Sequence, residues 1–314
     1  MQSLPLEAKV AMTQRRIKEW YDYWDGQVFL SFSGGKDSTV LKHIIDNTVG
    51  VHDVPAVFAD TGLEYPEVKK FATANADIVL RPEMRFDNVI KEYGYPLFNK
   101  ETAKRIYYGR RALQRGNPEV AEKYLFPIGK DKKTGETRQS RFKPSKKAID
   151  VALNTSIPVS WKCCDIMKKK PFKKYKKETG RKPILGMMAG EAIMRRNAWL
   201  LHGCNAFESK NPSSNPLAFW TEQDVLQYIV ENNIDYATVY GEIKQDENGK
   251  YYTTGVDRTG CMFCMFGVHL DKKPNRFQRM KETHPIQYAY CMKPVAEGGL
   301  GIAEILDYIG VEYK

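Results

Sequence analysis

The feature that most constrains the fold is a strand, a glycine turn and a helix in succession, in the segment QVFLSFSGGKDSTVLKHIID at residues 27–46. Val28–Phe32 is short and mostly apolar, two glycines interrupt it, and the apolar residues that follow recur at helical spacing. The same order returns at 54–74, and a third apolar run follows at 76–82. Strands that alternate with helices predict an α/β fold, with a doubly wound parallel sheet and helices on both of its faces.

The length of 314 residues fits one large α/β domain with appended regions. We expect an N-terminal helix within 1–24, the α/β domain over 25–240 with a basic insertion at about 100–160, and a region over 241–314, which contains a Cys-x-x-Cys motif and packs on the same domain. No apolar run reaches the length of a membrane span, and the first residues lack the apolar core of a secretion signal. The sequence therefore predicts a cytoplasmic protein without a membrane partner.

The net charge of +11 is concentrated in one segment. Lys162–Lys182 contains ten basic residues and two acidic ones, which is most of the imbalance of the whole chain. Such a run is often only a solvated helix face, but it also suits a polyanion. Lys168–Lys177 is therefore a candidate contact for nucleic-acid phosphate.

The glycine turn after the first strand has the composition of a phosphate-binding loop. Small residues let backbone N–H groups approach oxygen atoms, and the start of the next helix adds partial positive charge. The lysine can reach a phosphate, and the aspartate suits a Mg²⁺ ion that accompanies it. The spacing differs from the GxxxxGK[ST] form. The candidate phosphate ligands are Ser33, Gly34, Gly35, Lys36, Asp37 and Ser38.

Four of the six cysteines form two close pairs, Cys163–Cys164 and Cys261-x-x-Cys264. A CxxC in a glycine-bounded loop suits metal ligation, whereas directly adjacent cysteines are unusual for tetrahedral zinc. An iron–sulfur cluster accepts neighbouring thiolates on different irons, and four thiolates complete it. A zinc site, a redox disulfide and plain buried cysteines remain the alternatives. We interpret Cys204 as a buried small residue, and Cys291 is the one other thiol with catalytic appeal.

The sequence SGGKDS resembles the signature of the PP-loop ATP pyrophosphatases, which have the adenine nucleotide alpha-hydrolase fold. These enzymes split ATP between the α- and β-phosphates, adenylate a substrate and release pyrophosphate. The resemblance implies that residues 33–38 hold the pyrophosphate end of ATP with Mg²⁺, and that Lys36 and Asp37 act in catalysis.

Four further segments resemble the phosphoadenosine phosphosulfate (PAPS) reductase family: KCCDIMKKKPF, NPLAFWTEQDV, GCMFC and ADTGLEYP. In its adenylylsulfate reductase branch, a Cys-Cys pair and a Cys-x-x-Cys pair carry a [4Fe-4S] cluster. The resemblance also places residues after the second strand near the nucleotide, and the family has basic residues near the position of the Arg-Arg pair. The implied metal ligands are Cys163, Cys164, Cys261 and Cys264, and the further nucleotide ligands are Asp60, Thr61, Gly62, Arg195 and Arg196.

The C-terminus departs from the sulfonucleotide reductases of this family. It reads GVEYK and lacks their cysteine-containing tail, whereas the intact SGGKDS favours ATP. We therefore expect an ATP-using iron–sulfur enzyme that adenylates a substrate and takes part in sulfur transfer. Nucleic acid is a candidate acceptor, because the family has a DNA phosphorothioation member, and a sulfur-donor protein is a candidate partner. The alternatives are an adenylylsulfate or PAPS reductase that relies on Cys291, and a non-catalytic nucleotide-binding subunit of a modification or defence complex.

Overall fold

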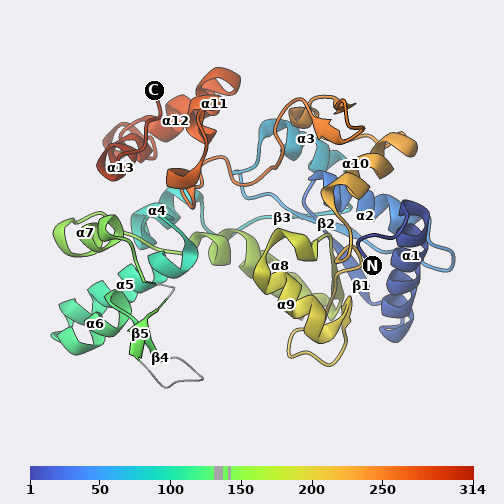
Figure 1. The fold of residues 1–314 in the computed structure, drawn as a ribbon, viewed down its shortest axis with the longest axis horizontal. Coiled ribbons are helices and arrows are strands. Elements are labelled where there is room, and N and C mark those ends of the chain that lie inside the picture. The colour runs from blue at the N-terminus through green and yellow to red at the C-terminus, as the bar shows by residue number, and fades with distance from the viewer. Residues whose placement is uncertain (131–136, 141–142) are drawn as a thin grey trace. The chain divides into compact units, whose positions relative to one another are not determined.

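The chain forms two compact units in a computed structural model that describes residues 1–130, 137–140 and 143–314 (Figure 1). Unit 1 comprises Met1–Pro82 and Lys170–Gly260, and unit 2 comprises Glu83–Lys169 and Cys261–Lys314. The domain boundaries expected from the sequence stay a prediction. Eight residues of the expected basic insertion lie outside the described residues, at 131–136 and 141–142.

Six strands form the central sheet of unit 1, in the order β3-β2-β1-β6-β8-β7 (Figure 1). β1 lies parallel to β2 and β6, with Leu30 paired to Ala56 on one side and to Ile184 on the other. β7 runs antiparallel to β8. The prediction of a largely parallel α/β sheet is confirmed. The strands span Val28–Phe32 (β1), Ala56–Ala59 (β2), Ile78–Leu80 (β3), Lys182–Leu185 (β6), Asn205–Ala206 (β7) and Ser213–Ser214 (β8).

Helices cover both faces of this sheet. Alternate side chains of β1 point to opposite faces, and each face carries apolar side chains that pack against helices. Leu30 and Phe32 enter the large core formed with α1, α2 and α10. Phe29 packs instead against Phe172 and Tyr175 of α8. The helices of unit 1 span Leu6–Tyr23 (α1), Lys36–Asp46 (α2), Pro66–Asn75 (α3), Lys170–Thr179 (α8), Ile193–His202 (α9) and Glu222–Glu231 (α10), and a hairpin joins Ile243–Gln245 (β9) to Tyr251–Thr253 (β10).

A buried ion pair connects α1 to α10. Lys9 Nζ lies 2.7 Å from the carboxylate of Asp224, and only 2% of the Lys9 residue surface is exposed. Asp224 also completes a capping box with Thr221, the residue before the start of α10. Because loss of one partner would leave a buried charge unpaired, this pair fixes the N-terminal helix on unit 1.

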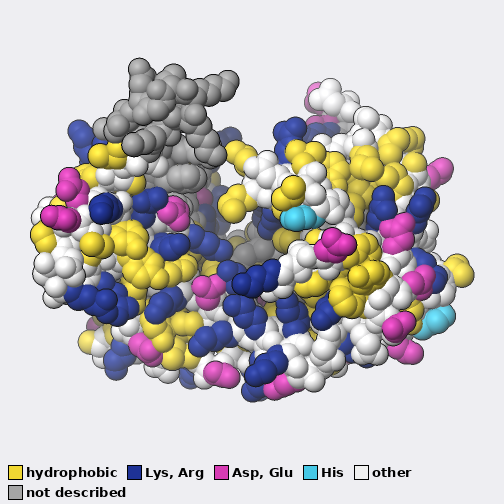
Figure 2. Space-filling model, turned by 90° about the horizontal axis from the view of Figure 1, so that it is seen from below, with side chains coloured by type: hydrophobic (Ala, Val, Ile, Leu, Met, Phe, Trp, Pro, Cys, Tyr) yellow, Lys and Arg dark blue, Asp and Glu magenta, His cyan; other side chains and the backbone are white. Residues whose placement is uncertain are grey.

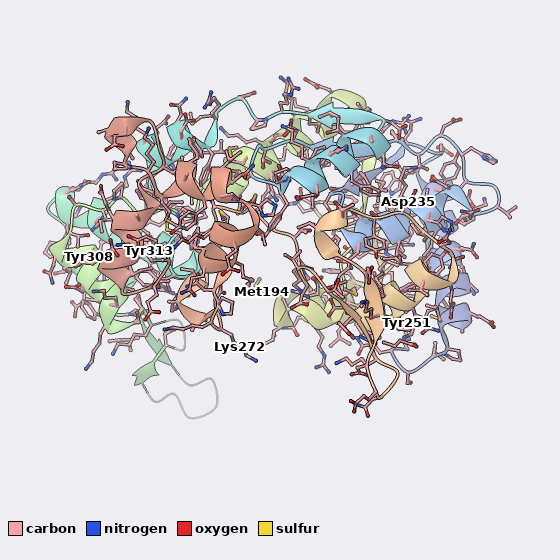
Figure 3. All side chains as sticks on the ribbon, turned by 90° about the horizontal axis from the view of Figure 1, so that it is seen from above. Met194, Asp235, Tyr251, Lys272, Tyr308 and Tyr313 are labelled. Carbon is pink, nitrogen blue, oxygen red and sulfur yellow. The ribbon has the colours of Figure 1, made fainter. Side chains whose placement is uncertain are left out.

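Unit 2 is mostly helical. Tyr308 Oη donates a hydrogen bond to Asp150 Oδ2 at 2.6 Å, which joins α13 to α7, and Tyr313 Oη donates to Asp307 (Figure 3). A π-helical turn at Asp165–Lys169 directly precedes α8. The other elements span Phe86–Tyr93 (α4), Lys100–Gln114 (α5), Pro118–Leu125 (α6), Ile128–Lys130 (β4), Thr137–Gln139 (β5), Lys146–Asn154 (α7), Arg276–Thr283 (α11), Pro285–Met292 (α12) and Ile302–Ile309 (α13).

The surface is rich in basic side chains, and Figure 2 shows more Lys and Arg than Asp and Glu on the viewed face. The segment Lys168–Lys177 forms the end of the π-helical turn and most of α8. Phe172 and Tyr175 face the sheet, so the exposed lysines of α8 point away from it. Among the described residues, no helix is both long and apolar enough to cross a bilayer.

Candidate functional site

The glycine loop lies where the order of the sheet reverses. The chain runs outward from β1 to β2 and β3, and then returns to place β6 on the other side of β1. In such sheets, ligands bind beyond the carboxyl ends of the strands at this switch point. The loop at 33–38 follows β1, and the segment at 186–191 follows β6. Gly186 permits their approach, because a Cβ there would lie 3.3 Å from the backbone of Asp37.

Serine hydroxyl groups hold the loop in shape. The Ser33 backbone N–H donates to Ser38 Oγ at 3.2 Å, and the two serine Oγ atoms lie 2.9 Å apart. Gly34 has a φ of +70°, and a Cβ at this residue would lie 2.7 Å from the Cβ of Ala72. Glycine is therefore required both by the left-handed backbone and by the close packing of α3.

Oxygen atoms surround the backbone where α2 begins. A Cβ at Gly35 would lie 3.3–3.4 Å from hydroxyl oxygens of Ser33, Tyr240 and Thr259. The Gly35 N–H donates to Ser33 Oγ, and the Lys36 N–H donates to Tyr240 Oη at 3.4 Å. These hydroxyl groups satisfy helix N-terminal donors, which are the same donors that bind phosphate in other proteins. A side chain at position 35 would fill this concave space.

Lys36 is buried and tied to two distant parts of unit 1. Its Nζ lies 2.6 Å from Glu222 Oε1 and 2.7 Å from the Asp257 carbonyl oxygen, and 5% of the residue is exposed. The Tyr240 ring centroid is 5.4 Å from the same nitrogen. Because 47% of the Glu222 side chain is exposed, its carboxylate can leave the lysine for water at small cost.

Asp37 occupies the first turn of α2 in an acidic environment. Burial is the main reason that its pKa is raised to about 6, and the charges of Glu191 and Glu222 raise it further. Lys36 and Arg258 oppose this shift. In the described part of the chain, Asp37 Oδ1 is buried and has no hydrogen-bond partner. Among the described residues, the charges of Lys36 and Arg258 act on Asp37, but neither cation forms an ion pair with its carboxyl group.

The raised pKa of Asp37 predicts a loss of stability as the pH rises. The folded state holds the Asp37 proton more tightly than the unfolded state does. Protonated Asp37 therefore stabilises the folded protein fully below about pH 4, and this stabilisation is lost as the pH rises through 6. In denaturant titrations, the free energy of unfolding of Asp37→Asn minus that of wild type should rise by about 1–3 kcal/mol from pH 4 to pH 7.5. Asp46→Asn, at the exposed end of the same helix, is the matched substitution for comparison. A constant difference between Asp37→Asn and wild type would contradict the shift.

The turn after β2 is closed by its own side chains. The Gly62 N–H donates to Asp60 Oδ1, and the carboxylate of Glu64 accepts hydrogen bonds from the N–H and hydroxyl of Thr61. Asp60 is also paired with Lys69 Nζ at 3.0 Å. A Cβ at Gly62 would meet nothing within 4 Å. The predicted nucleotide-binding role of Asp60, Thr61 and Gly62 stays a prediction.

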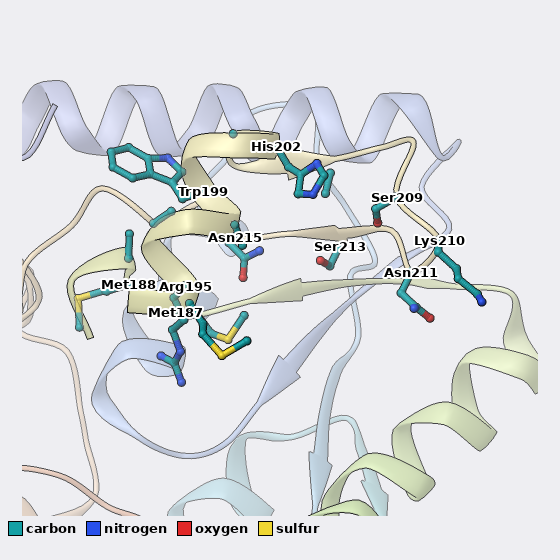
Figure 4. Close-up of a pocket in the computed structure, with 16 residues that line it drawn as sticks. Met187, Met188, Arg195, Trp199, His202, Ser209, Lys210, Asn211, Ser213 and Asn215 are labelled. Atoms are coloured by element: carbon teal, nitrogen blue, oxygen red, sulfur yellow. The ribbon is translucent and has the colours of Figure 1, made fainter. Parts of the chain in front are cut away.

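Of the two predicted arginines, Arg195 is connected to the phosphate loop through Glu191. The Glu191 carboxylate pairs with Arg195 and with Arg258, and its charge acts on Asp37. Arg196 lies exposed on α9. Arg195 also lines a cavity of about 440 Å³ beside α9, together with Met187, Trp199, His202 and Asn215 (Figure 4). The sequence singled out the arginines but not Tyr240 or Arg258, and Glu222 lies in the segment NPLAFWTEQDV without being predicted as a site residue.

In unit 2, the segment 95–98 brings the two cysteine pairs together. Tyr95 forms a parallel bridge with Val159, just before Cys163–Cys164, and Phe98 forms one with Phe266, just after Cys264. The Cys264 N–H donates to the Cys261 carbonyl oxygen at 3.1 Å, which closes the Cys-x-x-Cys turn. Arg276 supports this turn through a hydrogen bond to the Cys264 carbonyl oxygen.

The four thiols are close enough to affect one another's ionisation. The Cys163 and Cys164 Sγ atoms lie 4.0 Å apart, and their hydrogen bond, burial and the charges of Cys164, Cys264 and Cys261 raise the pKa of Cys163. The same hydrogen bond, with the charges of Lys100 and Lys168, lowers the pKa of Cys164 against the effect of burial. Within the described residues, no three His, Cys, Asp or Glu side chains form a group that could hold a single metal ion.

The other two cysteines are buried. Cys204 packs in the main core of unit 1, as predicted. Cys291 is fully buried in α12, and burial raises its pKa to about 12. A reactive cysteine needs an accessible thiolate, so the environment of Cys291 does not favour a nucleophile.

Comparisons with known proteins give one family. The family model described as phosphoadenosine phosphosulfate reductase domain matches residues 27–107 and 119–265, which include the phosphate loop and all four paired cysteines. Among solved structures, the chain is similar to a phosphoadenylyl-sulfate (PAPS) reductase from Candida auris in a phosphate complex. The identity is 15% and the TM-score 0.39, over 79% of this chain and 98% of that chain. No curated protein matches.

Proposed function

The chain belongs to the phosphoadenosine phosphosulfate reductase family, and from this membership we propose that it uses ATP to adenylate a substrate for sulfur transfer. The phosphates would bind on the loop at 33–38, and the bond between the α- and β-phosphates would break. One observation carries the proposal. The donors at the start of α2 are held by hydroxyl oxygens, and Lys36 Nζ is held by the half-exposed Glu222 carboxylate and the Asp257 carbonyl oxygen, so an incoming phosphate can displace the hydroxyls and the carboxylate.

In this mechanism, the backbone N–H groups of Gly35 and Lys36 bind phosphate oxygens in place of Ser33 Oγ and Tyr240 Oη. Lys36 Nζ exchanges Glu222 for phosphate and balances the charge that develops on the leaving pyrophosphate. Asp37, whose buried Oδ1 has no hydrogen-bond partner among the described residues, would hold the Mg²⁺ that neutralises the triphosphate. Arg195 and Arg258, positioned by Glu191, supply further positive charge beside the loop.

We propose further that Cys163, Cys164, Cys261 and Cys264 hold a [4Fe-4S] cluster. The support is that their thiols act on one another's pKa and that Lys100 and Lys168 favour thiolate at Cys164. A cluster binds each thiolate through a different iron, so it suits thiols that do not converge on one ion. The bound cluster would supply or hold sulfur, and the two lysines would balance its negative charge.

The acceptor and the sulfur source complete the proposal. The exposed lysines of α8 suit an anionic acceptor such as nucleic acid, and a sulfur-donor protein would deliver the sulfur. A reductase that acts on adenylylsulfate or PAPS is the alternative within the same family. That alternative needs a thiol nucleophile, and the remaining candidate, Cys291, is fully buried with a raised pKa.

Calorimetric titrations of the anaerobically prepared protein with ATP, adenylylsulfate and PAPS separate these functions. ATP with Mg²⁺ should bind at least about tenfold more tightly than adenylylsulfate, because adenylylsulfate has no pyrophosphate end for Lys36 and the loop. Tighter binding of either sulfonucleotide would refute ATP as the nucleotide and support the reductase.

A further inference from the structure

Unit 2 contains a group of aromatic side chains that includes Trp161, two residues before the first cysteine pair. Tyr93, Tyr107, Tyr108, Tyr124 and Trp161, here called the aromatic platform, come from α4, α5, α6 and the loop after α7. All five are half-buried, whereas most of the large aromatic residues of the unit 1 core are fully buried. Aromatic surface left partly open to water in one place marks an interaction site more often than a core.

The rings of Tyr107, Tyr108, Tyr124 and Trp161 form a continuous chain of contacts, and Lys162 links Tyr93 to Tyr107. The Trp161 centroid lies 5.3 Å from those of Tyr107 and Tyr108, and Tyr108 stacks on Tyr124 at 5.4 Å with an angle of 26°. Because these four rings brace one another, they lose little conformational entropy when a flat ligand stacks on them.

Two cations are interleaved with the rings. Lys162 Nζ lies 4.3 Å from the Tyr93 centroid and 5.1 Å from that of Tyr107, and the Arg111 guanidinium lies 5.6 Å from Tyr107. Both cations donate hydrogen bonds to Tyr107 Oη. Within the part of the chain that the structure describes, neither forms an ion pair with a carboxylate. Their charge is therefore available to an anionic ligand.

The helices that carry the platform are also basic. Residues 100–125 contain seven Lys and Arg side chains and three Glu side chains. Proteins that bind unpaired nucleotides combine aromatic rings with basic side chains. The bases stack on the rings, and the basic side chains pair with the phosphates. In a duplex the bases are stacked on one another and cannot reach such rings.

We propose that the aromatic platform binds the bases of a single-stranded nucleic acid and presents it beside Cys163 and Cys164. Lys162 and Arg111 would contact its phosphates. This inference deepens the proposed function, because it assigns the acceptor to unpaired DNA or RNA. It is tested without ATP, so its failure would leave ATP use untouched, and failure of ATP use would leave the binding result valid.

Fluorescence anisotropy with the full-length protein tests the platform. The probes are single-stranded DNA of about 20 nucleotides, RNA of the same sequence, the DNA duplex and an abasic strand of equal length. The proposal predicts that the DNA or RNA single strand binds at least about tenfold more tightly than the duplex and the abasic strand, and the tighter of the two identifies the acceptor. Equal binding of all four probes, or none, would overturn it.

Variants locate the binding surface. Trp161→Ala and Tyr108→Ala should each weaken single-strand binding by about 5- to 100-fold, and Trp161→Phe should restore most of it. Tyr252→Ala removes a half-exposed tyrosine from the β9–β10 hairpin of unit 1 and should bind as wild type does. Circular dichroism melting identifies variants that do not fold, in which case the comparison of base-containing and abasic strands on wild type still decides. Alanine variants that fold and bind normally would refute the platform.

Discussion

Replacement of Lys36 by methionine should weaken the binding of ATP with Mg²⁺ by at least about 30-fold in calorimetric titration. The lysine Nζ is buried between Glu222 and the Asp257 carbonyl oxygen, in a position where it can transfer from a carboxylate to a phosphate. Truncation of one partner of a desolvated charge pair costs about 2–5 kcal/mol, which sets this lower bound. Methionine keeps an unbranched side chain as far as Cε and removes the ammonium group with its charge and donors.

Lys42→Met is the matched control. Lys42 lies on the same helix and pairs with Asp46 near the surface, so its loss should leave ATP affinity within about twofold of wild type. Because Lys36→Met also leaves Glu222 without its partner, the melting temperatures of both variants need to be measured. Normal ATP affinity in a folded Lys36→Met protein would show that the loop at 33–38 does not bind the phosphates of ATP.

Replacement of Cys261 by serine should abolish the metal content of the protein. We expect anaerobically purified wild type to contain about four iron and four sulfide ions per chain with a broad visible absorption, and Cys261→Ser to contain almost none. The physical reason is that the four thiols that influence one another's charge provide one ligand to each iron.

Cys204→Ala provides the comparison for this measurement, since Cys204 lies in the apolar core of unit 1 and should retain full iron content. Zinc without sulfide in wild type would show that the protein holds a structural metal ion and not an iron–sulfur cluster. Unchanged iron in Cys261→Ser would show that the metal lies elsewhere.

Local sequence patterns predicted the elements that hold the phosphate loop. The short apolar run of Val28–Phe32 and the helical spacing of α2 depend on neighbours in the chain, and both are as expected. The partners of Lys36 could not be predicted in this way. Glu222 and Asp257 lie 186 and 221 positions away, and the segment NPLAFWTEQDV indicated a family but no contact with Lys36.

The arrangement of the cysteines shows the same limit. Their spacing indicated metal chemistry, but no local signal showed that Tyr95 and Phe98 would pair with segments beside each cysteine pair. The π-helical turn at Asp165–Lys169 also has no signature in the sequence. The aromatic platform joins residues from four segments, so its rings become a group only in the folded unit.

The bond of ATP that breaks is the most direct test of the proposed function. ATP labelled at its α- and γ-phosphates is incubated with the anaerobic protein, inorganic sulfide and a single-stranded DNA of about 20 nucleotides. If ATP is cleaved between the α- and β-phosphates, we expect the γ-label to appear in pyrophosphate and the α-label in AMP or an adenylated product. Release of the γ-label as inorganic phosphate with formation of ADP would contradict it, and ATP that stays bound but intact would identify a binding subunit instead of an enzyme.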